Sequence, residues 1–408
     1  MPAPNLIKPD RDFLNRTLNE GGEDLKKCYQ CATCSVVCDL SNQSAPFPRK
    51  EMLWAQWGLK DRLIADPDVW LCYQCNDCSK HCPRDARPGD VLVALRQESV
   101  RHYTFPRCLS NWFNQTKYLP VILLTPAILL TLALALRKPI ESIKPIEGII
   151  GFLDHHGFYA DFFPHWLLIG FFSLFTGLAA LAAAVGLIRF WRAMKADDAA
   201  SGKNGAVLGI VPSIIRTLLS IFTHDRFSKC QAQASRRQSH IFVFYGFLSL
   251  FIVTVWAVVD IYAMPYLFGI GPSYPFKQYH PMKILANVGC LILIVGCVRI
   301  ICNRLKREKE SVVNTPFDWI FVGLLLGVTI SGLFTEIMRV VAEPAHAAEQ
   351  AANSGTQYLA FGIYFVHLVL VFDILVYLPY SRFAHIIYRT VALVYAEHSG
   401  RNRSVQKT

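Results

Sequence analysis

Six long apolar stretches follow the first 110 residues of this chain. They cover residues 118–136, 166–190, 240–262, 283–302, 317–340 and 358–380. Each is close to the roughly 20 residues that an α-helix needs to cross the hydrocarbon core of a bilayer. A composition with 53% hydrophobic and only 17% charged residues agrees with this pattern. We therefore expect an all-α protein that contains a six-helix transmembrane bundle.

Basic residues are unevenly distributed between the connections that join these stretches. Eight Lys and Arg residues fall within 191–239 and four within 303–316, whereas 341–357 contains none. Basic connections stay on the cytoplasmic side of a membrane. The pattern predicts a multi-pass protein of the cytoplasmic membrane, with both termini and residues 1–110 in the cytoplasm. It also accounts for the net charge of +11 without a nucleic-acid partner.

One further apolar segment, residues 205–222, is shorter and contains Pro212 and Arg216. We interpret it as an amphipathic segment that lies on the cytoplasmic interface of the membrane. A seventh span is the alternative, but it would reverse the orientation of every later connection and of its basic residues.

Two copies of one cysteine pattern precede the apolar stretches. In each copy, gaps of two residues separate the first three cysteines, and a gap of three precedes the fourth. This spacing is typical of [4Fe–4S] ligands, and the fourth cysteine of each run then ligates the other cluster. The sequence predicts two clusters in a helical, ferredoxin-like cytoplasmic domain of residues 1–110. One would use Cys28, Cys31, Cys34 and Cys82, and the other Cys72, Cys75, Cys78 and Cys38.

Disulfides and zinc account for the cysteines less well. Disulfide frameworks belong to secreted domains, and residues 1–13 lack the apolar core of a signal peptide. Zinc also binds pairs of cysteines, but three cysteines at two-residue gaps followed by a fourth favour iron–sulfur. The long spacer between the runs favours a helical two-cluster domain over a compact bacterial ferredoxin.

Histidines within the apolar stretches predict haem. His367 and His385 are 18 residues apart, which is five turns and about 27 Å along one continuous helix. One helix could thus offer a ligand to each of two b haems stacked across the membrane. We pair His385 with His240 for the inner haem. For the outer haem, His367 would pair with His280, with His165 as the alternative. Residues 111–395 then form a membrane haem b domain, and 396–408 a cytoplasmic tail.

Several of these segments resemble known families. His367 and residues 378–385 resemble the last helix of the gamma subunit of respiratory nitrate reductase, and 241–246 resembles an earlier ligand-bearing helix of it. The region 28–82 resembles the C subunit of heterodisulfide reductase. The fusion of both parts resembles the membrane subunit of the quinone-interacting membrane-bound oxidoreductase (Qmo) complex. The chain departs from the nitrate reductase pattern, because its third stretch has one histidine instead of two and because stretch 118–136 is additional.

The resemblance implies a path for electrons. Menaquinol would be oxidised in the membrane, and its electrons would pass through haem b and the two clusters to flavin-containing soluble subunits. Adenylylsulfate reductase would be the end acceptor, in dissimilatory sulfate reduction. Lys283, one turn before Asn287 at the outer edge of the fourth stretch, is the candidate for a quinone contact.

Further functions stay open. The membrane domain could be a haem-free anchor for a cluster protein, or the same relay could serve heterodisulfide or sulfite reduction. A transporter is disfavoured, because charged residues within the spans, such as Asp373 and Glu336, are few. The chain has no adjacent cysteines and no GxGxxG fingerprint, so we expect neither a disulfide-cleaving cluster nor a tightly bound flavin or nicotinamide of its own.

Overall fold

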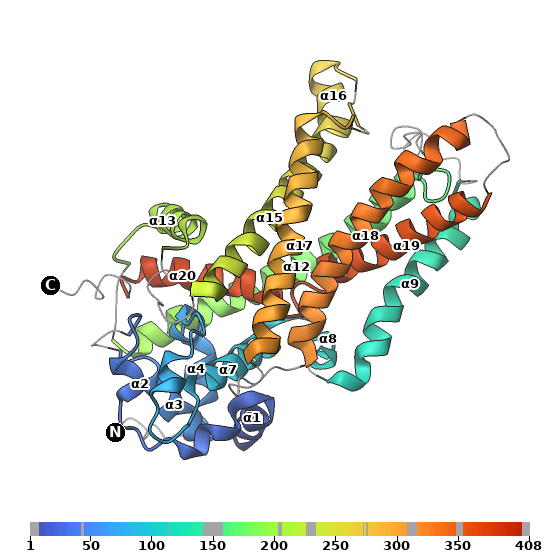
Figure 1. Cartoon of the computed structure of the whole chain (residues 1–408). Coiled ribbons are helices and arrows are strands. Elements are labelled where there is room, and N and C mark those ends of the chain that lie inside the picture. The colour runs from blue at the N-terminus through green and yellow to red at the C-terminus, as the bar shows by residue number, and fades with distance from the viewer. Residues whose placement is uncertain are drawn as a thin grey trace.

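The computed structural model describes residues 8–41, 45–113, 115–141, 158–202, 206–225, 234–271, 273–274, 276–307, 316–347 and 354–401. Within these ranges the secondary structure is helical, without a β-strand. The all-α prediction is therefore confirmed. Small helices near the N-terminus pack at one end of a bundle of long helices (Figure 1). We call this end of the bundle its cluster side and the opposite end its far side.

The long helices confirm the predicted six spans. Each is apolar and long enough to cross a membrane. They are α9 (Leu119–Ala135), α12 (His165–Ala200), α15 (Ala234–Val258), α17 (Pro281–Arg307), α18 (Pro316–Ala347) and α19 (Ser354–Val376). Shorter helices of this region are α10 (Arg137–Glu141), α13 (Ile210–Thr223), α16 (Met264–Phe268) and α20 (Ala384–His398).

Small residues bring α15 and α17 close together. A Cβ atom added to Gly246 would lie 2.7 Å from the Leu293 backbone nitrogen, and one added to Gly289 would lie 2.7 Å from Ser249 Cβ. Glycine at such a crossing lets two membrane helices approach each other. Helices α9, α12 and α18 instead pack on α19. The far ends of α15 and α17 lie apart from those of α18 and α19 (Figure 1).

The last apolar stretch is interrupted on the cluster side. Helix α19 ends at Val376, and α20 begins only at Ala384 after two turns that contain Pro379. Proline cannot donate its backbone nitrogen to a helix and restricts the residue before it. The expectation that one continuous helix carries both His367 and His385 is therefore wrong, and their 18-residue spacing does not place them on one helical face.

The cluster domain surrounds two cysteine loops with short helices. They are α1 (Arg11–Thr17), α2 (Thr33–Val36), α3 (Arg49–Gln56), α4 (Lys60–Ala65), α5 (Asp68–Leu71), α6 (Asp77–Lys80), α7 (Pro88–Tyr103) and α8 (Arg107–Trp112). Trp70 of α5 joins this domain to the membrane helices, because it stacks on Tyr388 of α20 at 5.6 Å and meets the edge of Phe190 of α12 at 6.3 Å. The two parts therefore share one hydrophobic core.

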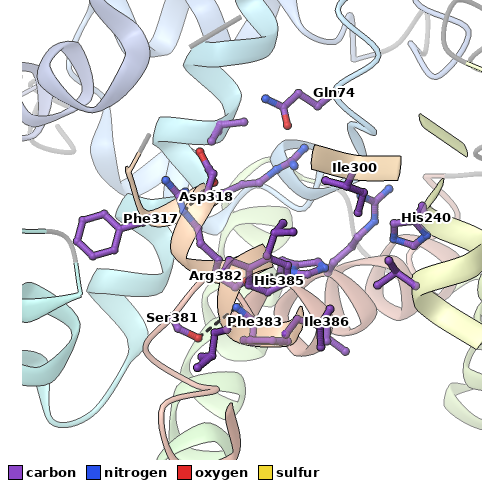
Figure 2. A pocket seen from close by; sticks show the side chains of 18 of the residues that line it. Gln74, His240, Ile300, Phe317, Asp318, Ser381, Arg382, Phe383, His385 and Ile386 are labelled. Atoms are coloured by element: carbon purple, nitrogen blue, oxygen red, sulfur yellow. Dashed lines mark hydrogen bonds and ion pairs between the residues drawn. The ribbon is translucent and has the colours of Figure 1, made fainter. Parts of the chain in front are cut away.

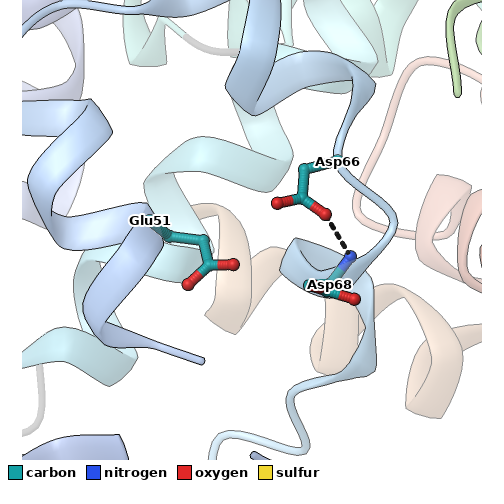
Figure 3. A group of neighbouring side chains, drawn as sticks. All are labelled: Glu51, Asp66 and Asp68. Atoms are coloured by element: carbon teal, nitrogen blue, oxygen red, sulfur yellow. Dashed lines mark hydrogen bonds between the residues drawn. The ribbon is translucent and has the colours of Figure 1, made fainter. Parts of the chain in front are cut away.

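Buried acidic side chains also fix the C-terminal segment to the cluster domain. Figure 3 shows Glu51, Asp66 and Asp68 close together below the loop that enters α5. Lys50 lies 2.7 Å from Asp66 and 2.6 Å from Asp68, and Arg401 lies 2.9 Å from Asp66 and 3.3 Å from Asp68. These cations compensate the buried carboxylates. The predicted tail is thus anchored up to Arg401, and residues 402–408 lie outside the described ranges.

Candidate redox site

The cysteines of the first group lie together. Cys28, Cys31 and Cys34 line one small hollow with Cys82 from the second run. These are the four residues that the crossed assignment gives to one cluster. Arg49 and Arg84 line the same hollow, so positive charge surrounds the thiolates that an iron–sulfur cluster requires.

The remaining four cysteines form a second group. Cys38 interacts electrostatically with Cys72 and Cys75, and Cys78 interacts with Cys72, Cys38 and Cys75. Burial raises the pKa of the Cys38 thiol to about 12, and it raises the pKa of Cys34 in the first group to about 11. Thiols in such surroundings stay protonated until a metal displaces the proton.

Both cysteine loops use the same unusual backbone. Gln30 and Ala32 in the first loop have φ angles of 68° and 69°, and Gln74 and Asn76 in the second have 52° and 64°. These residues flank the second cysteine of each run. Non-glycine residues seldom adopt positive φ angles outside functional turns. The duplicated sequence pattern therefore folds into the same turn twice, once at the second cysteine of each run.

A cavity of about 730 Å³ lies between the cluster domain and the membrane helices. Its size is within the range of small-molecule and cofactor sites, roughly 300–1,000 Å³. His240 of α15 and His385 of α20 both line it, as do Arg382 and Asp318, which form an ion pair at 3.3 Å (Figure 2). Both imidazoles are accessible, and the surface that they present belongs to this cavity. The structure thus brings together the two histidines predicted for the inner haem.

Hydrogen bonds orient both imidazoles in the same way. His385 Nδ1 lies 2.6 Å from the Arg382 carbonyl and donates to it. His224 Nδ1 donates to the Phe222 carbonyl at 3.2 Å, which leaves its Nε2 to accept from His240 Nδ1, also at 3.2 Å. The Nε2 atoms of His240 and His385 are then the basic nitrogens. This is the arrangement that metal-ligating histidines use.

The protonation state of His385 agrees with a ligand role. Desolvation in the cavity, together with nearby arginines, lowers the pKa of His385 to about 4. The imidazole is therefore neutral near pH 7, the form that binds iron. Two imidazoles that line one cavity are the donor set that a bis-histidine haem requires.

Arginines connect this cavity to the second cysteine group. Arg96 donates to the Cys72 carbonyl at 2.7 Å, and Arg389 donates to the same carbonyl at 3.2 Å. Arg389 follows His385 by four residues on α20, so both lie on one helical face. Guanidinium groups at the cavity also suit the carboxylates of a haem. The arginines that line it are Arg96, Arg236, Arg304, Arg382 and Arg389.

The histidines predicted for an outer haem have different surroundings. His367 packs on α18, where its Nδ1 lies 3.0 Å from Ser331 Oγ. His280 stacks on Phe276 at 4.6 Å and accepts a hydrogen bond from the Met282 backbone. Neither lines the cavity described above. His165 begins α12, which packs directly on α19, the helix of His367.

Lys283, predicted as a quinone contact, forms an ion pair with Glu336 of α18. Gln278 donates to the same carboxylate at 2.8 Å, and Arg339 lies 3.7 Å from it. The Lys283 ammonium thus already has a partner of opposite charge.

His224 is the residue that sequence reasoning missed. Its sequence context is that of an ordinary surface histidine, but only 8% of it is exposed, and it contacts His240. It terminates α13 with a left-handed backbone, φ 54°. The available signal in the sequence was the apolar segment 205–222. His224 directly follows this segment, and only a short connection separates it from His240 at the start of the third span.

Comparisons with known proteins agree with the division of the chain into a cluster domain and a membrane region. Residues 24–86 match the 4Fe-4S dicluster domain, and residues 115–406 match the citrate utilization protein B family. The chain belongs to the citrate utilization protein B family. Citrate utilization protein B from Escherichia coli is 26% identical over 392 residues, covering 91% of this chain and 89% of that protein. The alignment with that relative thus spans both the cysteine region and the membrane region of this chain.

The cluster domain has further relatives. The C subunit of H(2):CoB-CoM heterodisulfide,ferredoxin reductase from Methanothermobacter marburgensis is 34% identical over 100 residues, covering 24% of this chain and 54% of that protein. A protein from Archaeoglobus profundus that resembles the C subunit of heterodisulfide reductase is 36% identical over 84 residues. This match covers 20% of this chain and 45% of that protein. The chain thus spans about half the length of these relatives. No solved structure matches the chain.

These findings support a coarse assignment. This member of the citrate utilization protein B family is an iron–sulfur electron-transfer protein with two [4Fe–4S] clusters and a multi-pass membrane domain.

Proposed function

We propose that the chain is the quinone-reactive membrane subunit of an oxidoreductase complex, and that it carries electrons between menaquinone and a flavin-containing soluble partner. The observation that supports this most directly is the cavity that His240 and His385 share. Its wall includes Arg389, which binds the Cys72 carbonyl in the second cysteine group. A haem in the cavity would therefore lie beside a cluster.

The residues have distinct tasks in this proposal. Haem b and the two clusters, when bound, would each accept and release one electron at a time. His240 and His385 would hold the iron, and His224 and the Arg382 carbonyl orient their rings. The arginines of the cavity would balance the negative charge of haem carboxylates and of the thiolate-ligated cluster. The stacked rings of Trp70 and Tyr388 would keep water out of the contact between the membrane helices and the cluster domain.

We keep a second haem as part of the proposal. His367 would supply one ligand, and His165 or His280 the other. The packing of α12 on α19 favours His165 over the pairing with His280 that the sequence favours. Lys283 stays a proposed quinone contact on the far side, where binding a quinone would require it to part from Glu336.

The soluble partner is proposed from the relatives. The Escherichia coli relative, which matches 91% of this chain, is named for citrate utilization, so we propose a flavin-containing partner that acts on a carboxylic acid of this kind. Adenylylsulfate reductase, which the Qmo resemblance implied, is the second candidate. The basic connections support a cytoplasmic location for the cluster domain and this partner.

The first test is the cofactor content of the purified chain. We expect b-type haem by pyridine haemochrome, with about eight non-haem irons from two [4Fe–4S] clusters. His385→Ala should lose the haem of the cavity and keep the iron of both clusters. His398→Ala is the matched control, because His398 lies on the same helix as His385, donates to the Leu208 carbonyl and does not line the cavity.

The outcomes separate the alternatives. Full haem in His385→Ala would contradict the assignment of the cavity. Clusters without haem in the unaltered chain would leave the membrane-anchor function. To identify the partner, the reduced chain can be mixed with either candidate flavoprotein, and oxidation of the clusters followed by their visible absorption.

A further inference from the structure

A buried carboxyl group lies in the last membrane span. Asp373 of α19 is only 2% exposed, and neither of its carboxylate oxygens has a hydrogen-bond partner among the described residues. A buried polar group in this state costs free energy, and an ionisable one within a membrane span indicates a functional site. The sequence alone had given Asp373 no role.

Asp373 also lines the cavity that His240 and His385 share. Tyr377, one turn later, lines it too and donates from its hydroxyl to the Ile122 carbonyl of α9 at 3.3 Å. A buried carboxyl group and two haem-ligand candidates thus line one cavity.

Apolar side chains form another part of the wall. They come from the start of α9 and from α15, and they are Leu119, Ile122, Leu123, Val243, Phe244, Phe247, Leu248 and Phe251. Leu123 is 41% exposed and Phe251 57% exposed, although both line the cavity. Helix α9 packs on α19, whereas α15 packs on α17. The cavity therefore has an apolar part, whose wall includes exposed side chains of α9 and of α15.

We propose that this part of the cavity binds the head group of a membrane quinone, with Asp373 as the residue that exchanges its proton. The inference rests on the proposed function and places its quinone reaction on the cluster side, apart from Lys283. The isoprenoid tail would leave between α9 and α15 into the bilayer. A carboxyl group meets a quinone oxygen as an acceptor when ionised and as a donor when protonated.

The step balances for quinol oxidation. One O–H bond of the quinol would break, its proton would pass to a carboxylate oxygen of Asp373, and one electron would pass to the one-electron acceptor that His240 and His385 would hold. Asp373 then releases the proton to water. A second O–H bond reacts in the same way, so that one quinol yields one quinone, two protons and two electrons. The flavin of the soluble partner is the final oxidant, and quinone reduction runs through the same residues in reverse.

Asp373→Asn tests the proposal in the full-length chain in detergent. Two measurements are needed: the rate at which menadiol reduces the haem, and the binding of the quinol analogue 2-heptyl-4-hydroxyquinoline N-oxide, followed by quenching of its fluorescence. Removal of a general base slows a proton-coupled step by about 10²–10⁴-fold, so we expect haem reduction to slow at least about 100-fold. Reduction of the haem by dithionite and its absorption spectrum should not change.

Two further variants are controls. Asp373→Glu keeps the carboxyl group and should recover part of the rate. Asp260→Asn removes another buried aspartate of the membrane region, but one that accepts hydrogen bonds from Ser273 and Tyr274 and does not line the cavity. It should leave the menadiol reaction unchanged.

The two measurements show whether Asp373 belongs to a quinone site. A normal menadiol rate with normal analogue binding in Asp373→Asn would overturn the proposal, as would loss of haem, which would make Asp373 part of the haem site. The analogue titration needs no haem. If the unaltered chain contained none, the proposed function would fail, while loss of analogue binding in Asp373→Asn alone would still support the quinone site.

Discussion

His240 donates its Nδ1 proton to His224 Nε2 across 3.2 Å, and His224 in turn is held by the Phe222 carbonyl. The orientation of a candidate haem ligand on α15 therefore depends on α13, the short apolar helix that does not cross the bundle. We predict that His224→Phe keeps the protein folded but weakens haem binding about 10–100-fold, as is usual for residues that orient a metal ligand. Haem titration of the apo-protein measures this change.

A second substitution at this position tests whether the hydrogen bond itself is responsible for the loss of haem affinity. His224→Gln offers an amide oxygen that can accept from His240 Nδ1, so it should restore most of the haem affinity. Equal affinities in all three proteins would show that His240 does not need this hydrogen bond.

Arg389 is the basis of the second prediction. Its guanidinium contacts the Cys72 and Leu71 carbonyls and lies 3.8 Å from the Tyr73 ring centroid. Arg389→Ala should lower the reduction potential of the neighbouring cluster, because a positive charge that stabilises the reduced, more negative cluster is lost. It should also slow electron transfer between haem and cluster. Redox titration by electron paramagnetic resonance reports the potential.

The control for this prediction is Arg189→Ala. Arg189 lies on α12, over the Phe105 ring, and does not line the cavity. This substitution should leave the reduction potentials of the haem and of the neighbouring cluster unchanged. An unaltered cluster potential in Arg389→Ala would show that this guanidinium does not influence the cluster of the Cys72 loop.

The third prediction concerns the attachment of the C-terminal segment. Arg401 pairs with Asp66 and Asp68 of the cluster domain and with Asp198 of α12. Arg401→Ala leaves these carboxylates with less compensation, and breaking a buried pair costs about 3–5 kcal/mol. We expect a lower thermal midpoint and faster proteolysis of the cluster domain. Lys60→Ala, which removes a more exposed pair with Asp10 at 3.7 Å, should change stability by less than about 1 kcal/mol.

The sequence predicted some parts of this molecule better than others, for physical reasons. The cysteine spacing and the six apolar stretches are local patterns, so the dicluster domain and the membrane helices could be read directly from the chain. The break between α19 and α20 was missed because apolar residues continue on both sides of Pro379. Pro379 itself was the available warning, since proline within an apparent helix marks a kink or an end.

Contacts between distant segments could not be read in this way. The hydrogen bond from His240 to His224, the ion pair of Lys283 and the isolation of Asp373 all depend on how separate helices pack. Nothing in their sequence spacing encodes these neighbours. The outer histidines show the same limit, because their partner is set by helix packing rather than by periodicity.

The last prediction tests the contact between α15 and α17, because α15 carries His240 in the wall of the cavity. Gly246 of α15 faces α17, and a Cβ atom there would lie 2.7 Å from the Leu293 nitrogen and 2.9 Å from the Gly289 carbonyl oxygen. Gly246→Val should therefore push α15 away from α17 and displace His240, which lies six residues earlier on α15. We expect loss of haem with both clusters retained. Gly177→Val is the matched control, because nothing lies within 4 Å of a Cβ atom at that position of α12. Normal haem content in Gly246→Val would show that the position of His240 does not depend on the contact between α15 and α17.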